Sequence, residues 1–118
     1  MDSTYLLKLS AAQQELLAQR PFISKELLSA AVAEHAEQIG YMLQAYFPKE
    51  KIRKVAVIPG SIAIQNGGPV ALRLQFIKEE FNVCSAIDSE LKDTMAITVD
   101  IDRFAGVLKL KGETWPEL

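Results

Sequence analysis

Two aspartates, Asp100 and Asp102, are the first residues of this chain whose type and spacing could do chemistry. They lie two residues apart in the segment TMAITVDIDRF, residues 94–104, which alternates apolar and polar residues. That alternation predicts a β-strand, on which residues two apart point to the same face. Two carboxylates on one face could bind a metal ion or act in acid–base catalysis. They could equally belong to the solvated side of a sheet.

The segment that follows, GVLKLKG, favours the solvated sheet face. If the chain turns at Phe104-Ala105, each apolar residue of the first strand faces another apolar residue, and the polar ones face lysines. The predicted pairs are Val99–Leu110, Ile101–Leu108, Asp100–Lys109 and Thr98–Lys111. Sheet pairing rewards this register. The preferred interpretation is therefore a hairpin with cross-strand ion pairs, in which only Asp102 has no charged residue directly opposite.

His35 is the only histidine, and it lies in the middle of an apolar helical stripe. A catalytic imidazole needs a group that orients it, but no residue three or four positions away is acidic. The pattern is typical of a partly buried packing residue. The alternative is a pocket or interface histidine, whose charge would change near its ordinary pKa of about 6.5.

The remaining candidates have ordinary structural interpretations. Cys84 is the only cysteine and has no histidine nearby in sequence, so it is interpreted as a small buried residue. The basic run KEKIRK, residues 49–54, follows a predicted helix end, where cations are stabilised; contact with nucleic acid is the alternative. The glycines of PGSIAIQNGG match no phosphate-binding motif and indicate turns.

The composition is that of a folded domain of ordinary polarity. The 118 residues are 49% hydrophobic and 24% charged, with a formal net charge of −2, so no strong field draws the chain to nucleic acid or to a membrane. The N-terminus lacks the features of a signal peptide, no apolar run is long enough to span a membrane, and a lone cysteine suits a reducing compartment. We expect a single cytoplasmic domain, residues 1–118, with no membrane or nucleic-acid partner.

Two helices are predicted in the first half. Ser10 and Gln13 form a capping box for the first, while residues 5–9 before it are either part of that helix or an extended arm. Ser24 caps the second, which runs from Lys25 to a stop at Pro48 and should be one long helix. Its apolar stripe has spacings of four and three residues: Leu28, Val32, His35, Ile39, Met42 and Tyr46.

Strands are predicted in the second half, where the apolar period changes to two. They cover residues 51–59, 61–65 and 69–77, followed by the hairpin of residues 94–111, with a tight turn at Asn66–Gly68 between the second and third. Residues 79–93 fit either a short helix near Ser85 or a strand extension with a loop. The predicted fold is a two-layer α+β domain, with helices packed on an antiparallel sheet of about five strands.

These observations favour a non-enzymatic interaction module, chaperone-like or an adaptor, that binds a protein partner or a small apolar ligand and forms a homodimer. The element order is similar to that of small acidic secretion chaperones, a likeness of topology carried by no motif. The residues expected at a pocket or interface are His35, Ile39, Met42, Tyr46, Arg73 and Trp115. Trp115 should either dock on the domain or meet a partner.

The alternative is a small metal-dependent or hydrolytic enzyme. It would use Asp100, Asp102 and His35, and it requires these three side chains to converge on one cleft. No cofactor or metal is predicted, because no further ligand can be placed beside the two aspartates from the sequence.

Overall fold

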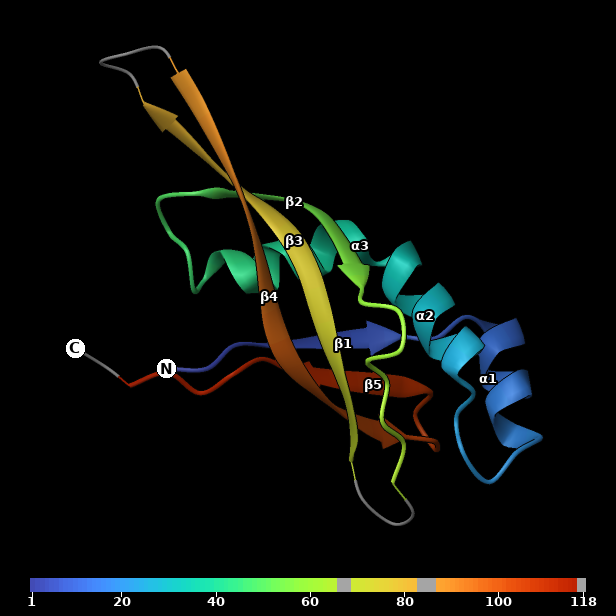
Figure 1. Ribbon diagram of the computed structural model, residues 1–118. Helices are drawn as coiled ribbons and strands as arrows, with labels where there is room; N and C mark the ends of the chain where they lie inside the picture. The colour runs from blue at the N-terminus through green and yellow to red at the C-terminus, as the bar shows by residue number, and fades with distance from the viewer. Residues whose placement is uncertain (66–68, 83–86, 117–118) are drawn as a thin grey trace.

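One antiparallel sheet forms one layer of the molecule, and three helices pack against it (Figure 1). The structure is a computed structural model that describes residues 1–65, 69–82 and 87–116. The elements follow in the order β1 (Thr4–Lys8), α1 (Ala11–Ala18), α2 (Lys25–Glu34), α3 (Ala36–Gln44), β2 (Lys51–Val57), β3 (Val70–Asn82), β4 (Ile87–Asp102) and β5 (Val107–Lys111). The strand order is β1-β5-β4-β3-β2, with every pair antiparallel. The predicted α+β fold is confirmed.

The inner face of the sheet carries the core. Its buried residues alternate along the central strands, with Val70, Leu72, Leu74 and Phe76 from β3 and Met95, Ile97 and Val99 from β4. Helix α3 contacts both edge strands, β1 and β2, so it closes the open side of the curled sheet over these residues. None of the helices in the described residues covers the outer face of the sheet.

The β4–β5 hairpin has the predicted register. Val99 pairs with Leu110, Ile101 with Leu108, Asp100 with Lys109 and Thr98 with Lys111. Asp102, the residue left without an opposite charge, has a structural role: its Oδ1 accepts a hydrogen bond of 3.0 Å from the Ala105 backbone N–H. It therefore caps the turn that joins the two strands.

The predicted long helix is in fact two helices, because the chain leaves the helical conformation at His35. His35 has φ −108° and ψ 18°, ends α2 and begins α3. Its side chain Nδ1 lies 2.8 Å from the Tyr5 hydroxyl of β1. No proline or glycine marks this break, and the apolar stripe continues through it, so the sequence pattern could not reveal it.

One strand prediction is wrong, and the structure decides two segments for which the sequence allowed alternatives. Residues 61–65 are not a strand: only Ala63 forms a bridge, to Ala71 of β3. Residues 5–9, left open between helix and arm, contribute to β1, which supplies the fifth strand instead. For residues 79–82 and 87–93 the strand alternative is confirmed, since β3 and β4 pair from Asn82↔Ile87 to Val70↔Val99.

The pairing of β3 with β4 continues past the end of β2. The last β2 pair is Lys51↔Glu79, after which β3 and β4 continue as a two-stranded ribbon that projects from the body in Figure 1. The molecule accordingly measures 55 × 29 × 25 Å. The predicted turn at Asn66–Gly68 and the interpretation of Cys84 lie outside the described residues.

Candidate functional site

The residues predicted to line a pocket or interface do not form one site. Ile39 and Met42 are 0% and 5% exposed, and both pack in the core. Arg73 lies on the opposite, outer face, where its Nη2 is 3.1 Å from the Thr94 hydroxyl. Within this set, Tyr46 and Trp115 are the two aromatic side chains whose rings are in contact.

Trp115 docks on the body beside Tyr46. The two ring centroids are 4.9 Å apart in an edge-on arrangement, and Phe47 completes the cluster at 5.4 Å from Trp115. The Tyr46 hydroxyl accepts a hydrogen bond from Ser3 N–H at 2.9 Å and donates one to the Glu113 carbonyl at 2.7 Å. The cluster therefore ties both chain ends to the end of α3.

This tyrosine is closely surrounded, and its chemistry reflects that. Burial raises the pKa of the Tyr46 phenol above its ordinary value, against a smaller lowering by the Ser3 hydrogen bond. A side chain at Gly112 would meet the Tyr46 hydroxyl, since an added Cβ would lie 2.5 Å from it. The cluster is therefore held together by close structural contacts.

The side chains of the alternative, enzymatic interpretation do not converge. Asp100 is exposed on the outer face of the sheet, and Asp102 caps its turn. His35 instead lies on the helix side, bonded to Tyr5 of β1. Within residues 1–65, 69–82 and 87–116, no three His, Cys, Asp or Glu side chains are grouped so that they could hold a metal ion.

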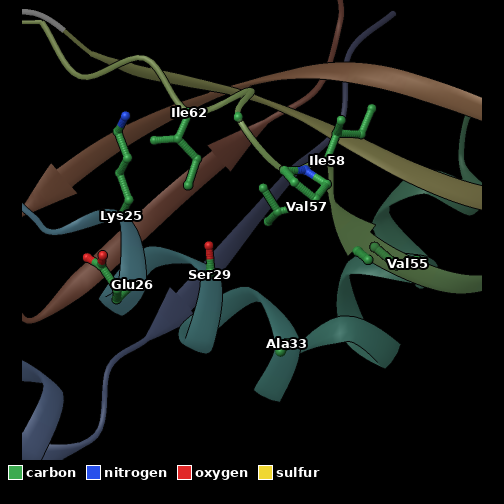
Figure 2. A pocket seen from close by; sticks show the side chains of 11 residues that line it. Lys25, Glu26, Ser29, Ala33, Val55, Val57, Ile58 and Ile62 are labelled. Atoms are coloured by element: carbon green, nitrogen blue, oxygen red, sulfur yellow. The ribbon is translucent and has the colours of Figure 1, made fainter.

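A groove of about 500 Å³ lies between α2 and the free edge of β2 (Figure 2). One wall is the strand and the segment after it, and the other is one side of α2. The lining is mostly apolar: Val55, Ala56, Val57, Ile58, Pro59, Gly60, Ile62 and Ala33, with Lys25, Glu26 and Ser29 as its polar members. A volume of this size is typical of a binding cleft.

Unpaired backbone groups of β2 face this groove. Ile58 N–H donates to the Arg73 carbonyl of β3 at 2.9 Å, and Val57 is the Cα partner of Leu74. In antiparallel pairing, neighbouring residues point their backbone groups to opposite sides of the strand. The N–H and C=O of Val57 therefore point away from β3, toward the groove. An exposed edge of this kind is a template for another strand.

The two halves of β2 differ in how far their free edge is protected from pairing with another strand. The first half carries Lys51, Arg53 and Lys54, and it is bent by a bulge between Arg53 and Ala56. Charges and bulges both discourage the pairing of an edge with another strand. The second half, Ala56 and Val57 with Ile58 directly after the strand, has neither device and is apolar on both faces. This is the half that lines the groove.

Comparison of the chain with protein-family models, with curated proteins and with solved structures gave no match. In the described part of the chain, no helix is both long and apolar enough to cross a membrane. Function is therefore inferred from the geometry of the groove and of the sheet.

Sequence reasoning did not find the groove, although one signal was present. Residues 55–58 read VAVI, four apolar residues in a strand that otherwise alternates. A run without alternation is typical of a strand buried on both faces, but β2 is an edge strand. The run and the edge position point to a binding surface only when the strand order is known.

Proposed function

We propose that this protein is a non-enzymatic interaction module that binds an extended segment of a partner protein along β2. The observation that carries the proposal is the unprotected second half of β2, which lines a groove of about 500 Å³. The occupant adds a strand to the sheet: its backbone bonds to the Val57 N–H and C=O, and its side chains meet the apolar lining. Its residues in the groove are therefore apolar and extended.

The chemistry of the walls supports this occupant over a small apolar molecule. A small apolar ligand would leave the outward backbone groups of Val57 without partners, which costs free energy when they are buried. A peptide backbone satisfies both groups. The Ser29 hydroxyl on α2, which points toward the strand in Figure 2, supplies a further polar contact from the opposite wall. We place this function in the cytoplasm, where the single cysteine stays reduced.

A second copy of the chain is the competing occupant. Two β2 strands related by a twofold axis would pair antiparallel and join two sheets into one. This is the form that the expected homodimer would take, and it uses the same edge. Light scattering across a wide range of protein concentration separates the two cases, since self-association produces a mass that rises with concentration.

The test replaces single backbone donors. Val57→Pro removes the N–H that points into the groove, and a proline is tolerated on the free side of an edge strand. Peptides are selected from a display library against the natural chain, and their affinities are measured by fluorescence anisotropy. We expect selected peptides with consecutive extended apolar residues, and a loss of affinity of about tenfold in Val57→Pro, the effect of one lost hydrogen bond in a dry site.

Leu6→Pro is the matched control. Leu9 N–H and Gly112 N–H bond to Gly106 and Ser3 carbonyls, so the alternation on β1 turns the Leu6 N–H away from β5, to the other edge of the sheet. This variant should bind the same peptides with unchanged affinity. Equal losses in both variants, or selected peptides that ignore Val57→Pro, would contradict binding at β2.

A further inference from the structure

The outer face of the sheet carries a second hollow, of about 430 Å³, on the opposite side of β2 from the groove. Three neighbouring strands contribute to it. Its lining residues are Lys54 from β2, Gln75, Phe76 and Ile77 from β3, and Lys92, Asp93 and Thr94 from β4. The proposed binding of a peptide along β2 does not use this hollow.

A β-bulge shapes the hollow. Arg53 pairs with Ile77 and Ala56 pairs with Gln75, so Lys54 and Val55 together face the single residue Phe76. Lys54 has φ 54°, and it is the one non-glycine residue with a positive φ in the part of the chain that the structure describes. This left-handed conformation is unfavourable for a lysine. Bulges turn side chains to new directions and are common beside binding sites.

Cations surround the hollow without acidic partners. Among the described residues, neither Lys54 nor Lys92 forms a salt bridge, whereas nearby Arg53 pairs with Glu79 at 2.5 Å. The one acidic residue of the lining, Asp93, is already paired with Lys78, which also contacts Glu50. Its Oδ2 lies 3.1 Å from Lys78 Nζ, and its Oδ1 accepts a hydrogen bond of 2.7 Å from Thr94 N–H.

Neutral donors and another cation complete the arrangement. The Gln75 amide and the Thr94 hydroxyl lie on the same lining, and they belong to residues that are Cα partners across β3 and β4. Arg73 is next to them, with Nη2 3.1 Å from Thr94 Oγ1. A chain with a net charge of −2 therefore gathers three cations and two neutral polar groups around one hollow.

We propose that this hollow binds a small ligand through an oxyanion, a phosphate or carboxylate group. Lys54 and Lys92 supply the charge, and Gln75 and Thr94 supply neutral hydrogen bonds. Hydrogen bonds between ionised donors and an oxyanion are stronger than neutral ones, which lets an exposed site hold a small anion. Ile77 gives the ligand's carbon skeleton an apolar surface.

The probes are inorganic phosphate and acetate, titrated into the natural chain while two-dimensional amide NMR spectra are recorded. Sodium chloride at matched ionic strength is the reference, because salt screens exposed charges. We expect saturable shifts at Lys54, Gln75, Lys92 and Thr94 with phosphate or acetate, and none that saturate with chloride. Saturation with phosphate alone identifies a phosphate site, and saturation with acetate alone identifies a carboxylate site.

Two variants test the assignment. Lys92→Ala removes one cation, and Lys54→Gly removes the other while glycine keeps the bulge conformation at no steric cost. Each should weaken binding about fivefold, as expected for the loss of one charged hydrogen bond in an exposed site. The control is Lys109→Ala, an exposed outer-face lysine on β5, which should bind as the natural chain does.

The proposal is wrong if neither anion gives saturable shifts at these four residues. It is equally wrong if Lys109→Ala weakens binding as much as Lys54→Gly and Lys92→Ala do, since that result indicates general attraction to surface charge. Failure here leaves the groove at β2 untouched, because the peptide and the anion bind opposite sides of the strand.

Discussion

The two edges of the sheet differ in how the helices meet them. At the β1 edge, residues that flank the helices form hydrogen bonds with the strand and with the residue before it: Tyr46, after α3, accepts from Ser3 N–H at 2.9 Å, and Nδ1 of His35, between α2 and α3, lies 2.8 Å from the Tyr5 hydroxyl. At the β2 edge, no hydrogen bond between described residues joins α2 to the strand, and the groove opens between them. The β1 edge is thus tied by side-chain hydrogen bonds, whereas the β2 edge packs on α3 and leaves a groove beside α2.

The strands themselves repeat the difference. β1 has only five residues and ends in a lysine, two features that protect an edge from pairing with another chain. β2 has seven residues and is protected in its first half alone. Natural proteins usually protect such edges from pairing with other chains. The unprotected half of β2 is therefore best explained by the proposed binding of a peptide. This difference between the edges supports the proposed binding at β2 and a stabilising role for the β1 edge.

The largest expected effect compares two neighbouring positions of β2. Ala56 pairs with Gln75 and points its N–H toward β3, so Ala56→Pro removes a ladder hydrogen bond and should cost about 3 kcal/mol of unfolding free energy. Val57→Pro removes an N–H that faces the groove and should cost less than about 1 kcal/mol. Denaturant unfolding measures both. Equal losses would mean that the Val57 N–H is already bonded within the fold and that the β2 edge is closed.

Local pattern was enough to predict one part of the sheet. The β4–β5 hairpin has the predicted pairs, because the cross-strand match of Val99 with Leu110 and of Asp100 with Lys109 is encoded within 14 consecutive residues, 98–111. Ser10 and Ser24 likewise cap α1 and α2 as predicted, since a cap depends on the next three residues.

The parts that sequence missed depend on contacts between distant residues. The helix break at His35 accompanies a hydrogen bond to Tyr5, 30 residues away. Residues 61–65 alternate like a strand, yet the Ser61 hydroxyl bonds to Arg73 N–H at 3.1 Å and only Ala63 pairs with β3. The groove requires α2 to lie beside β2, an arrangement that no local pattern encodes.

A middle-sized effect tests the β1 edge through Tyr46. Burial raises the pKa of this phenol, so the folded state keeps its proton at pH values where the unfolded chain loses it. Its contribution to stability is therefore complete below the ordinary value of about 10 and is lost as pH rises through the folded pKa. We expect the free energy of unfolding to fall as the pH rises above about 10, the ordinary pKa of tyrosine, in the natural chain, as measured by denaturant unfolding.

Tyr46→Phe should flatten that fall and lower stability at neutral pH by about 2 kcal/mol, because Ser3 N–H and the Glu113 carbonyl lose their partner. Tyr41→Phe is the control. The hydrogen bond with Glu37 raises the pKa of Tyr41, but this side chain is exposed on α3, so its removal should leave neutral stability nearly unchanged. If both variants behave alike, Tyr46 does not lock the β1 edge.

The smallest expected effect concerns the protected half of β2 and has an unusual sign. Lys54 holds φ 54°, a conformation that costs a lysine about 1 kcal/mol and costs glycine almost nothing. Lys54→Gly should therefore raise the unfolding free energy, by up to about 1 kcal/mol, less the extra entropy that glycine gives the unfolded chain. Lys51→Gly, at the start of the same strand, relieves no strain and should lower the unfolding free energy by about 0.5–1 kcal/mol.

Opposite signs in denaturant unfolding would show that the bulge strains Lys54. Because such strain persists only where the surrounding fold imposes it, that result would also mean that the fold holds the bulge in place. A loss in both variants would mean that the bulge does not strain Lys54.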